Sequence, residues 1–245
     1  MSLGDNRSFI DLTRPLMELY AAKTGSEFIV IDKNSSIVKD YTQVHANGRN
    51  NNISYVLKIK AVWHYLELYD RVLWLDDTCV VKPTARDLFD IMPCDTMKAF
   101  NEGSMPELNS WKLDMIFIRQ KTGFVIDTQK YINAGVVLYT QKSREYLGDY
   151  YIDKHAELFG SKYVDQGYLN FVIQQYDIPI AFFDSRCNRM MIQCEYVSGR
   201  EKEAHTIDPQ HIIDSDDEIY HVTGFYADRH NIVKKLCRIV SLLWP

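Results

Sequence analysis

The stretch LWLDDTCVV, residues 73–81, joins an apolar segment directly to two carboxylates and a hydroxyl. Residues 73–75 are typical of a buried strand, and Asp76, Asp77 and Thr78 follow at its end. Neighbouring carboxylates repel one another, and the removal of water strengthens that repulsion unless a cation is bound there. A hard divalent ion such as Mn²⁺ or Mg²⁺ takes oxygen ligands of this kind and is often shared with a diphosphate. The stretch therefore predicts either a metal site or, as the plainer alternative, a turn capped by Asp and Thr.

Helical and strand patterns alternate on both sides of this stretch. Apolar residues recur at roughly helical spacing over residues 53–69, and a strand over 72–75 follows at once. Further strands are expected at 27–32, 132–140, 178–183 and 218–223, and further helices at 11–25, 144–159, 165–176 and 229–243. This alternation predicts an α/β fold with a mixed, mostly parallel central sheet flanked by helices. In such sheets, ligands bind beyond the carboxyl ends of the strands.

The helix expected at 11–25 has signals at both ends. Thr13 can cap its N-terminus, Pro15 suits its first turn, and Gly25 can end it. These residues predict the boundaries of the helix.

The composition excludes several classes of protein. With 245 residues, 46% of them hydrophobic, the chain is expected to form a single domain over 1–245. The net charge of -5 gives no basic field with which to bind nucleic acid. Neither a run of about eighteen apolar residues nor a secretory signal occurs, so we expect a soluble protein without a membrane span. The five cysteines lack CxxC spacing, which favours a reducing compartment, and we expect the cytoplasm.

Five segments occur in the order seen in one enzyme family. The segment IKAVWHYLELYDRVLWLDDTCVV resembles the Lys-helix-strand-DxD segment of GT-A glycosyltransferases, closest to glycosyltransferase family 8, the family of glycogenin and galactinol synthase. The other four are SLGDNRSF, INAGVVLY, VDQGYLN and HVTG, which resemble the first-strand loop, the FNSGVxVY strand, the DQGxLN helix start and the HxxG turn. The compact chain also resembles virus-encoded members. The resemblance implies a Rossmann-like GT-A fold.

The resemblance implies a pocket for a nucleotide-sugar donor, with a UDP-hexose such as UDP-glucose as the expected donor. Lys60 lies where the family has a lysine that reaches toward the donor phosphate or sugar. Gly224 would let the backbone approach a diphosphate closely. The remaining pocket residues would be Leu3, Asp5, Asn6 and Phe9, whose ring could pack on the uracil.

The resemblance also implies a metal site, with one departure from the family. Asp76 matches the first carboxylate of the DxD, but the third position is Thr78 instead of a carboxylate. Either Thr78 contacts the metal weakly or Asp77 becomes the second ligand. His221 would complete the site, and an imidazole suits Mn²⁺ better than Mg²⁺. Where the family places a phosphate-binding lysine, this chain has Ala227, Asp228 and then Arg229.

Three residues would line the side of the site that holds the sugar and the acceptor. Asn133 begins its strand, and Asp165 and Gln166 begin a helix. Asp165 would orient the donor sugar or the acceptor hydroxyl, although an aspartate there also caps a helix. The resemblance thus implies transfer of a hexose, with retention of configuration, to a hydroxyl of a glycan, a protein or a small polyol. The alternatives are a sugar-nucleotide-binding or scaffolding domain and a sugar-nucleotide hydrolase.

Overall fold

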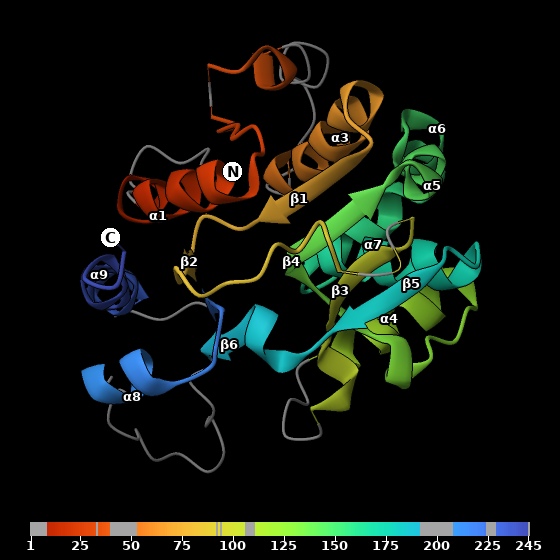
Figure 1. The fold of residues 1–245 in the computed structure, drawn as a ribbon. Helices are drawn as coiled ribbons and strands as arrows, with labels where there is room; N and C mark the ends of the chain where they lie inside the picture. The colour runs from red at the N-terminus through yellow and green to blue at the C-terminus, as the bar shows by residue number, and fades with distance from the viewer. Residues whose placement is uncertain are drawn as a thin grey trace. The chain divides into compact units, whose positions relative to one another are not determined.

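A computed structural model describes most of the chain (Figure 1). The residues described are 9–32, 34–39, 53–91, 93, 95–105, 111–191, 208–223 and 229–244. The chain divides into two compact units, each built from separate stretches of sequence. The first unit comprises residues 1–30, 75–87 and 184–245, and the second comprises 31–74 and 88–183. The assignment of 1–245 to a single domain stays a prediction.

The second unit is built on a four-stranded sheet. Its strands, in spatial order, are β1 (Arg71–Leu75), β4 (Ile132–Thr140), β3 (Met97–Asn101) and β5 (Ile180–Phe183). β3 runs antiparallel to β4 and parallel to β5. Every residue of β4 is buried, which fits a strand covered on both faces. Helices α3 (Ile53–Leu68) and α7 (Val164–Gln175) both contact β4.

Shorter helices complete the second unit. They are η1 (Glu102–Ser104), α4 (Lys112–Thr122), η2 (Thr128–Lys130), α5 (Gln141–Arg144), η3 (Glu145–Leu147), α6 (Asp149–Lys154) and η4 (Ala156–Gly160).

The first unit is built on a three-stranded sheet. Its strands, in spatial order, are β2 (Cys79–Val81), β7 (Ile219–Val222) and β6 (Arg189–Met191). β7 is antiparallel to β2 and parallel to β6. Helices α1 (Phe9–Thr24) and α9 (Arg229–Ser241) pack against β2 and against each other. The short helices η5 (Ser185–Asn188) and α8 (Pro209–Asp214) contact β7 and α9 respectively.

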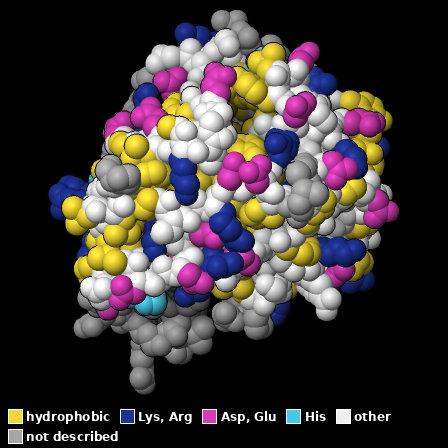
Figure 2. Space-filling view, in the orientation of Figure 1, with side chains coloured by type: hydrophobic (Ala, Val, Ile, Leu, Met, Phe, Trp, Pro, Cys, Tyr) yellow, Lys and Arg dark blue, Asp and Glu magenta, His cyan; other side chains and the backbone are white. Residues whose placement is uncertain are grey.

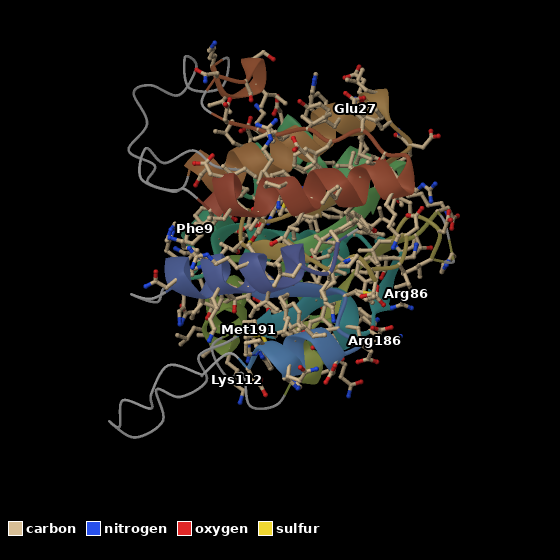
Figure 3. The ribbon with its side chains drawn as sticks, turned by 60° about the vertical axis from the view of Figure 1, so that its left-hand side comes forward. Phe9, Glu27, Arg86, Lys112, Arg186 and Met191 are labelled. Atoms are coloured by element: carbon tan, nitrogen blue, oxygen red, sulfur yellow. The ribbon has the colours of Figure 1, made fainter. Side chains whose placement is uncertain are left out.

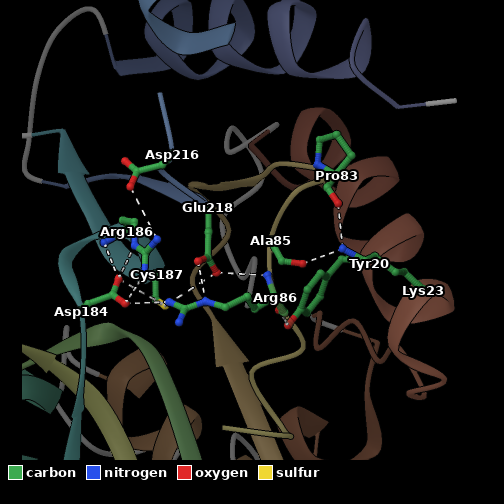
Figure 4. A network of polar contacts seen from close by, with 10 residues as sticks. All are labelled: Tyr20, Lys23, Pro83, Ala85, Arg86, Asp184, Arg186, Cys187, Asp216 and Glu218. Atoms are coloured by element: carbon green, nitrogen blue, oxygen red, sulfur yellow. Dashed lines mark hydrogen bonds and ion pairs between the residues drawn. The ribbon is translucent and has the colours of Figure 1, made fainter. Parts of the chain in front are cut away.

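Ion pairs join distant parts of the first unit (Figure 4). Arg86 contacts Glu218 at 2.6 Å and Asp184 at 2.7 Å. Arg186 also pairs with Asp184, at 2.9 Å. The guanidinium of Arg186, together with that of Arg86, holds the pKa of Asp184 well below its usual range. Three chain stretches, near residues 86, 185 and 218, are therefore joined.

Most elements expected from the sequence are present, and the mixed α/β fold is confirmed. The described strands form two mixed sheets, however, where one mostly parallel sheet was expected. On the face drawn in Figure 2, acidic and basic side chains are interspersed without a broad basic area. Within the described ranges, no helix combines the length and apolarity needed to cross a membrane.

The N-terminal boundary expected for the first helix is wrong. The helix begins at Phe9, so Thr13 and Pro15 lie inside it. Thr13 is fully buried, and its hydroxyl contacts the backbone oxygens of Phe9 at 3.1 Å and Asp77 at 2.9 Å. A tertiary contact has therefore replaced the expected cap. Gly25 does end the helix: its φ of 65° is left-handed, a conformation that glycine adopts without strain.

Two other expected elements differ in the structure. Residues 27–31 form no strand, and Ile29 is 36% exposed, so the expected buried strand is wrong. The helix expected at 144–159 is divided into η3, α6 and η4. Gly148 separates the first two, in an extended conformation. A Cβ at this position would lie 3.2 Å from the indole nitrogen of Trp63, so this glycine also allows close packing.

Candidate functional site

The first unit brings together an aspartate and a histidine that are far apart in sequence. Asp76 follows β1, and the antiparallel pairing of β2 with β7 sets Cys79 opposite His221. The carboxylate oxygen Oδ2 of Asp76 lies 3.7 Å from Nε2 of His221. His221 is buried, whereas the carboxylate of Asp76 is 34% exposed. The pair is thus open to a ligand from the side of the aspartate.

Asn188 fixes the orientation of the histidine ring. Its amide oxygen lies 3.1 Å from Nδ1 of His221, and both side chains are buried. An amide oxygen accepts a hydrogen bond, so in the neutral ring Nδ1 carries the hydrogen and Nε2 keeps its lone pair. Metal-binding histidines are commonly held in one tautomer by such a contact. The arrangement leaves Nε2, the nitrogen near Asp76, free to act as a ligand atom.

The spacing of these two atoms suits a shared ion. Ligand atoms bound about 2.2 Å from one metal lie roughly 3 to 4 Å apart, and the observed separation is 3.7 Å. Across the parts of the chain that the structure covers, no group of three or more His, Cys, Asp or Glu side chains is arranged to hold a metal. The pair fits a cation that takes its other ligands from water or from a substrate.

Thr78 and Asp77, the two alternatives for a further metal ligand, differ in their contacts. Thr78 is fully buried, and its hydroxyl oxygen accepts a hydrogen bond from Arg229 at 3.0 Å. Arg229 also donates to the backbone oxygen of Val222 at 2.9 Å. A guanidinium so close disfavours a divalent ion on the Thr78 oxygen, because like charges repel. The backbone oxygen of Asp77 accepts a hydrogen bond from Thr13 at 2.9 Å, which fixes the turn.

Of the four residues of the first-strand loop that were predicted to line the nucleotide pocket, the structure describes only Phe9. Its ring lies at the start of α1, beside the N-terminal end of α9 (Figure 3). The guanidinium carbon of Arg229 is 5.3 Å from the ring centroid, and the ring of His230 is 5.7 Å away. Phe9 therefore already packs against two side chains. Leu3, Asp5, Asn6 and Gly224 lie outside the described residues.

The second unit brings together the three residues predicted to line the sugar and acceptor side. Oε1 of Gln166 lies 3.3 Å from Nδ2 of Asn133 and accepts from the backbone nitrogen of Ala134 at 3.1 Å. Asp165, which directly precedes Gln166 in α7, forms an ion pair with Lys58 at 2.8 Å. All of these side chains are buried. They join the start of β4, the first turn of α7 and the middle of α3.

Lys58 was not expected in this cluster, because the resemblance pointed to Lys60. Lys60 instead pairs at 2.8 Å with Asp149, whose side chain is 59% exposed. Residues two apart on a helix point in different directions, so only one of the two lysines can reach Asp165. Lys58 is 4% exposed and lies among the buried residues Leu57 and Ile59. A lysine within an apolar helical run was the available signal of a buried ion pair.

Glu102 is a second residue that sequence reasoning missed. Its Oε2 accepts from Nδ2 of Asn133 at 3.0 Å and from Nε2 of Gln166 at 2.9 Å. Burial raises the pKa of Glu102, and the nearby charge of Asp114 raises it further, against the two hydrogen bonds. Glu102 follows β3 directly, so a polar residue at a strand end was the available signal. It fixes the amide groups of both neighbours.

Burial also raises the pKa of Asp114, beside this cluster. The Asp114 carboxylate accepts from the backbone nitrogens of Lys162 at 2.9 Å and Tyr163 at 3.2 Å, just before α7. It also accepts from the hydroxyl of Tyr131 at 3.2 Å. Asp114, and not Asp165, therefore holds the backbone donors ahead of α7.

The raised pKa of Glu102 predicts a pH dependence of stability. Replacing Glu102 with Gln keeps the shape of the side chain and removes its titratable carboxyl group. The folded protein binds the Glu102 proton more tightly than the unfolded protein does. The free energy of unfolding of the wild type, relative to that of the Gln variant, should therefore fall as the pH rises above 4.5, the ordinary pKa of a glutamate. Urea unfolding of both proteins at pH 5 and pH 8 measures this difference. Glu157→Gln, at an exposed position, should show no such change. A difference that is constant or grows with pH contradicts the prediction.

Comparison with known proteins identifies the fold. No family model and no curated protein matches the sequence. A glycosyltransferase involved in glycosylation of the major capsid of PBCV-1 matches with a TM-score of 0.58 and 14% identity, over 95% of each chain. The galactosyltransferase LgtC, solved with donor and acceptor sugar analogs, matches with a TM-score of 0.54 and 18% identity, over 100% of this chain and 95% of that one. Mouse xyloside xylosyltransferase 1 matches with a TM-score of 0.51 and 13% identity, over 86% and 82%.

These similarities show the architecture of the chain. It has the fold of GT-A glycosyltransferases, as the sequence motifs predicted.

Proposed function

We propose that this protein is a metal-dependent glycosyltransferase that moves a hexose from a nucleotide-diphosphate sugar to an acceptor hydroxyl. The observation that carries the proposal is the pair formed by Asp76 and His221, with its ligand atoms 3.7 Å apart and its ring oriented by Asn188. The GT-A fold supports it, since the similar structures are of glycosyltransferases. The donor we propose is a UDP-hexose such as UDP-glucose, as the ordered motifs imply.

In this proposal the first unit holds the metal and the diphosphate of the donor. Asp76 and His221 would bind Mn²⁺ or Mg²⁺, which would offset the charge that develops on the departing diphosphate. Asn188 keeps the imidazole in the tautomer that can bind a metal. Asp77 is the better candidate for a further ligand, because Thr78 already accepts from Arg229.

The residues predicted for the sugar and the acceptor, Asn133, Asp165 and Gln166, all belong to the second unit. Asn133 and Gln166 are held by Glu102, so their positions are set before a substrate binds. Lys58 keeps the carboxylate of Asp165 compensated in its buried position. Hydrogen-bonding groups fixed in this way discriminate well between hydroxyl positions of a sugar. Retention of configuration remains part of the proposal through the resemblance alone.

One observation favours a second candidate function. Thr78 replaces a carboxylate of the family motif, and a cationic side chain contacts it. Such a change would weaken a metal site and is compatible with a sugar-nucleotide-binding or scaffolding domain. A sugar-nucleotide hydrolase is the third alternative.

Titration of the protein with Mn²⁺ and UDP-glucose separates these functions. For a transferase, we expect UDP release that depends on Mn²⁺ and increases when a glycan, a peptide or a polyol is added as acceptor. Release that no acceptor increases would indicate a hydrolase. Donor binding without release, measured by calorimetry, would indicate a binding domain. Absence of both metal and donor binding would overturn the proposal.

A further inference from the structure

The second unit carries a cluster of four tyrosines, from η3, the first turn of α6 and the C-terminal end of α7, which we call the tyrosine patch: Tyr146, Tyr150, Tyr151 and Tyr176. The rings of Tyr146 and Tyr176 are stacked, with centroids 5.2 Å apart and planes at 23°. The ring of Tyr151 meets that of Tyr176 edge to face at 5.0 Å, and that of Tyr150 in the same way at 5.0 Å. None of the four belongs to the polar cluster around Gln166.

Contacts with Lys154 and His155 hold the tyrosine patch in place. The hydroxyl of Tyr176 lies 2.8 Å from Nε2 of His155 and 3.2 Å from Nζ of Lys154. The His155 ring is itself buried against Phe171, with centroids 4.7 Å apart. Tyrosine side chains lose little conformational entropy on binding, and packing of this kind reduces the loss further. The rings are therefore preorganised for a ligand.

The patch also faces solvent. Tyr150 is 69% exposed, and the other three rings are partly exposed. Large aromatic rings gain free energy when they are covered, whereas their hydroxyl groups need partners. A ligand that matches both properties has apolar faces and polar edges. Sugar rings have C–H groups on their faces and hydroxyl groups around their edges.

Charges around the patch narrow the choice of ligand. Nζ of Lys154 lies 5.6 to 5.9 Å from the ring centroids of Tyr150, Tyr151 and Tyr176. A protein cation already takes the place that a cationic ligand would need. Exposed carboxylates at Glu145 and Asp153 disfavour anionic ligands such as nucleic acid or an acidic membrane. The class of ligand that remains is neutral and rich in hydroxyl groups.

We propose that the tyrosine patch binds a neutral oligosaccharide, and that the acceptor of this protein is accordingly a glycan. The choice of acceptor rests on the proposed glycosyltransferase function, whereas oligosaccharide binding at the patch does not. Of the three acceptor classes that the sequence left open, the patch selects the one with repeated sugar rings. A second contact of this kind would raise the affinity for a chain of sugars over that for a single sugar.

Saturation-transfer NMR titrations of the full chain test the proposal. The probes are maltopentaose, cellopentaose and xylopentaose, each in the absence of nucleotide sugar. We expect at least one to bind the wild-type protein, and Tyr150→Ala to weaken that binding by about fivefold or more, since one stacking surface is lost. Tyr150→Phe keeps the ring and should bind within about twofold of the wild type. Phe182→Ala removes a ring of β5, 43% exposed and outside the patch, and should have no effect.

Two results would overturn the proposal: failure of all three probes to bind, or equal binding by the wild type and Tyr150→Ala. The same samples are assayed for Mn²⁺-dependent UDP release from UDP-glucose, which Tyr150→Ala should leave unchanged without an oligosaccharide. Oligosaccharide binding without any UDP release would contradict the transferase function and leave the patch supported. UDP release without oligosaccharide binding would contradict the patch alone.

Discussion

Replacing Asp76 with Asn is expected to lower both Mn²⁺ affinity and the rate of Mn²⁺-dependent UDP release by at least about a hundredfold. The amide keeps the size of the side chain but removes the negative charge that, with Nε2 of His221, would bind the ion. Electron paramagnetic resonance of free Mn²⁺ measures the affinity directly, so the result does not depend on turnover.

A matched control and a graded variant make this test specific. Asp11→Asn changes an exposed aspartate of the same unit and should leave both quantities unchanged. Asn188→Ala removes the contact to Nδ1 of His221, so the lone pair is no longer fixed at Nε2. We expect an intermediate loss of about 10- to 100-fold in metal affinity. Wild-type Mn²⁺ affinity in Asp76→Asn would show that the pair does not bind metal.

Replacing Lys58 with Met is expected to lower the free energy of unfolding by about 3 to 5 kcal/mol, because it leaves the carboxylate of Asp165 buried without its cation. The side chains of Lys58 and Asp165 are only 5% and 8% exposed, so water cannot solvate the carboxylate in place of the lysine. Urea unfolding followed by circular dichroism measures the change.

Lys60→Met provides the control within the same helix. Its ion pair has the same length, 2.8 Å, but the partner Asp149 is 59% exposed, so we expect a loss below about 1 kcal/mol. Adding Asp165→Asn to Lys58→Met should recover part of the stability, since the uncompensated charge is then gone. Equal losses in Lys58→Met and Lys60→Met would refute the prediction.

Much of the fold could be predicted from local pattern. The largely apolar sequence of β4 and the helical spacing of α3 identified two buried elements, and the structure confirms both. Patterns failed where a distant contact decides the conformation. Thr13 has the right side chain for a helix cap, yet it is buried against the backbone of Asp77.

The candidate site was only partly predictable. Asp76 stood out because it is followed by a second carboxylate at the end of a buried strand, where like charges repel one another. Its partner His221 lies more than half the chain away, so only the ordered motifs pointed to it. Glu102 and Lys58 were missed because a polar residue at a strand end and a lysine in an apolar helical run do not show which side chains they contact in the folded chain. The motifs pointed to Asn133 and Gln166 as candidate residues, but not to the carboxylate that contacts both of them.

The sheet of β2, β7 and β6 has a consequence for how the protein is made. One of its edge strands, β2, lies at Cys79–Val81, whereas its central strand β7 begins at Ile219 and the helix α9 begins at Arg229. On the ribosome, β2 must therefore remain without its partner β7 until residues 82–222 have also been made. Closing so large a loop is slow. Until it closes, an unpaired apolar strand such as Cys79–Val81 promotes aggregation. Nascent chains of this protein should consequently depend on chaperones more than those of proteins whose sheets form from consecutive strands.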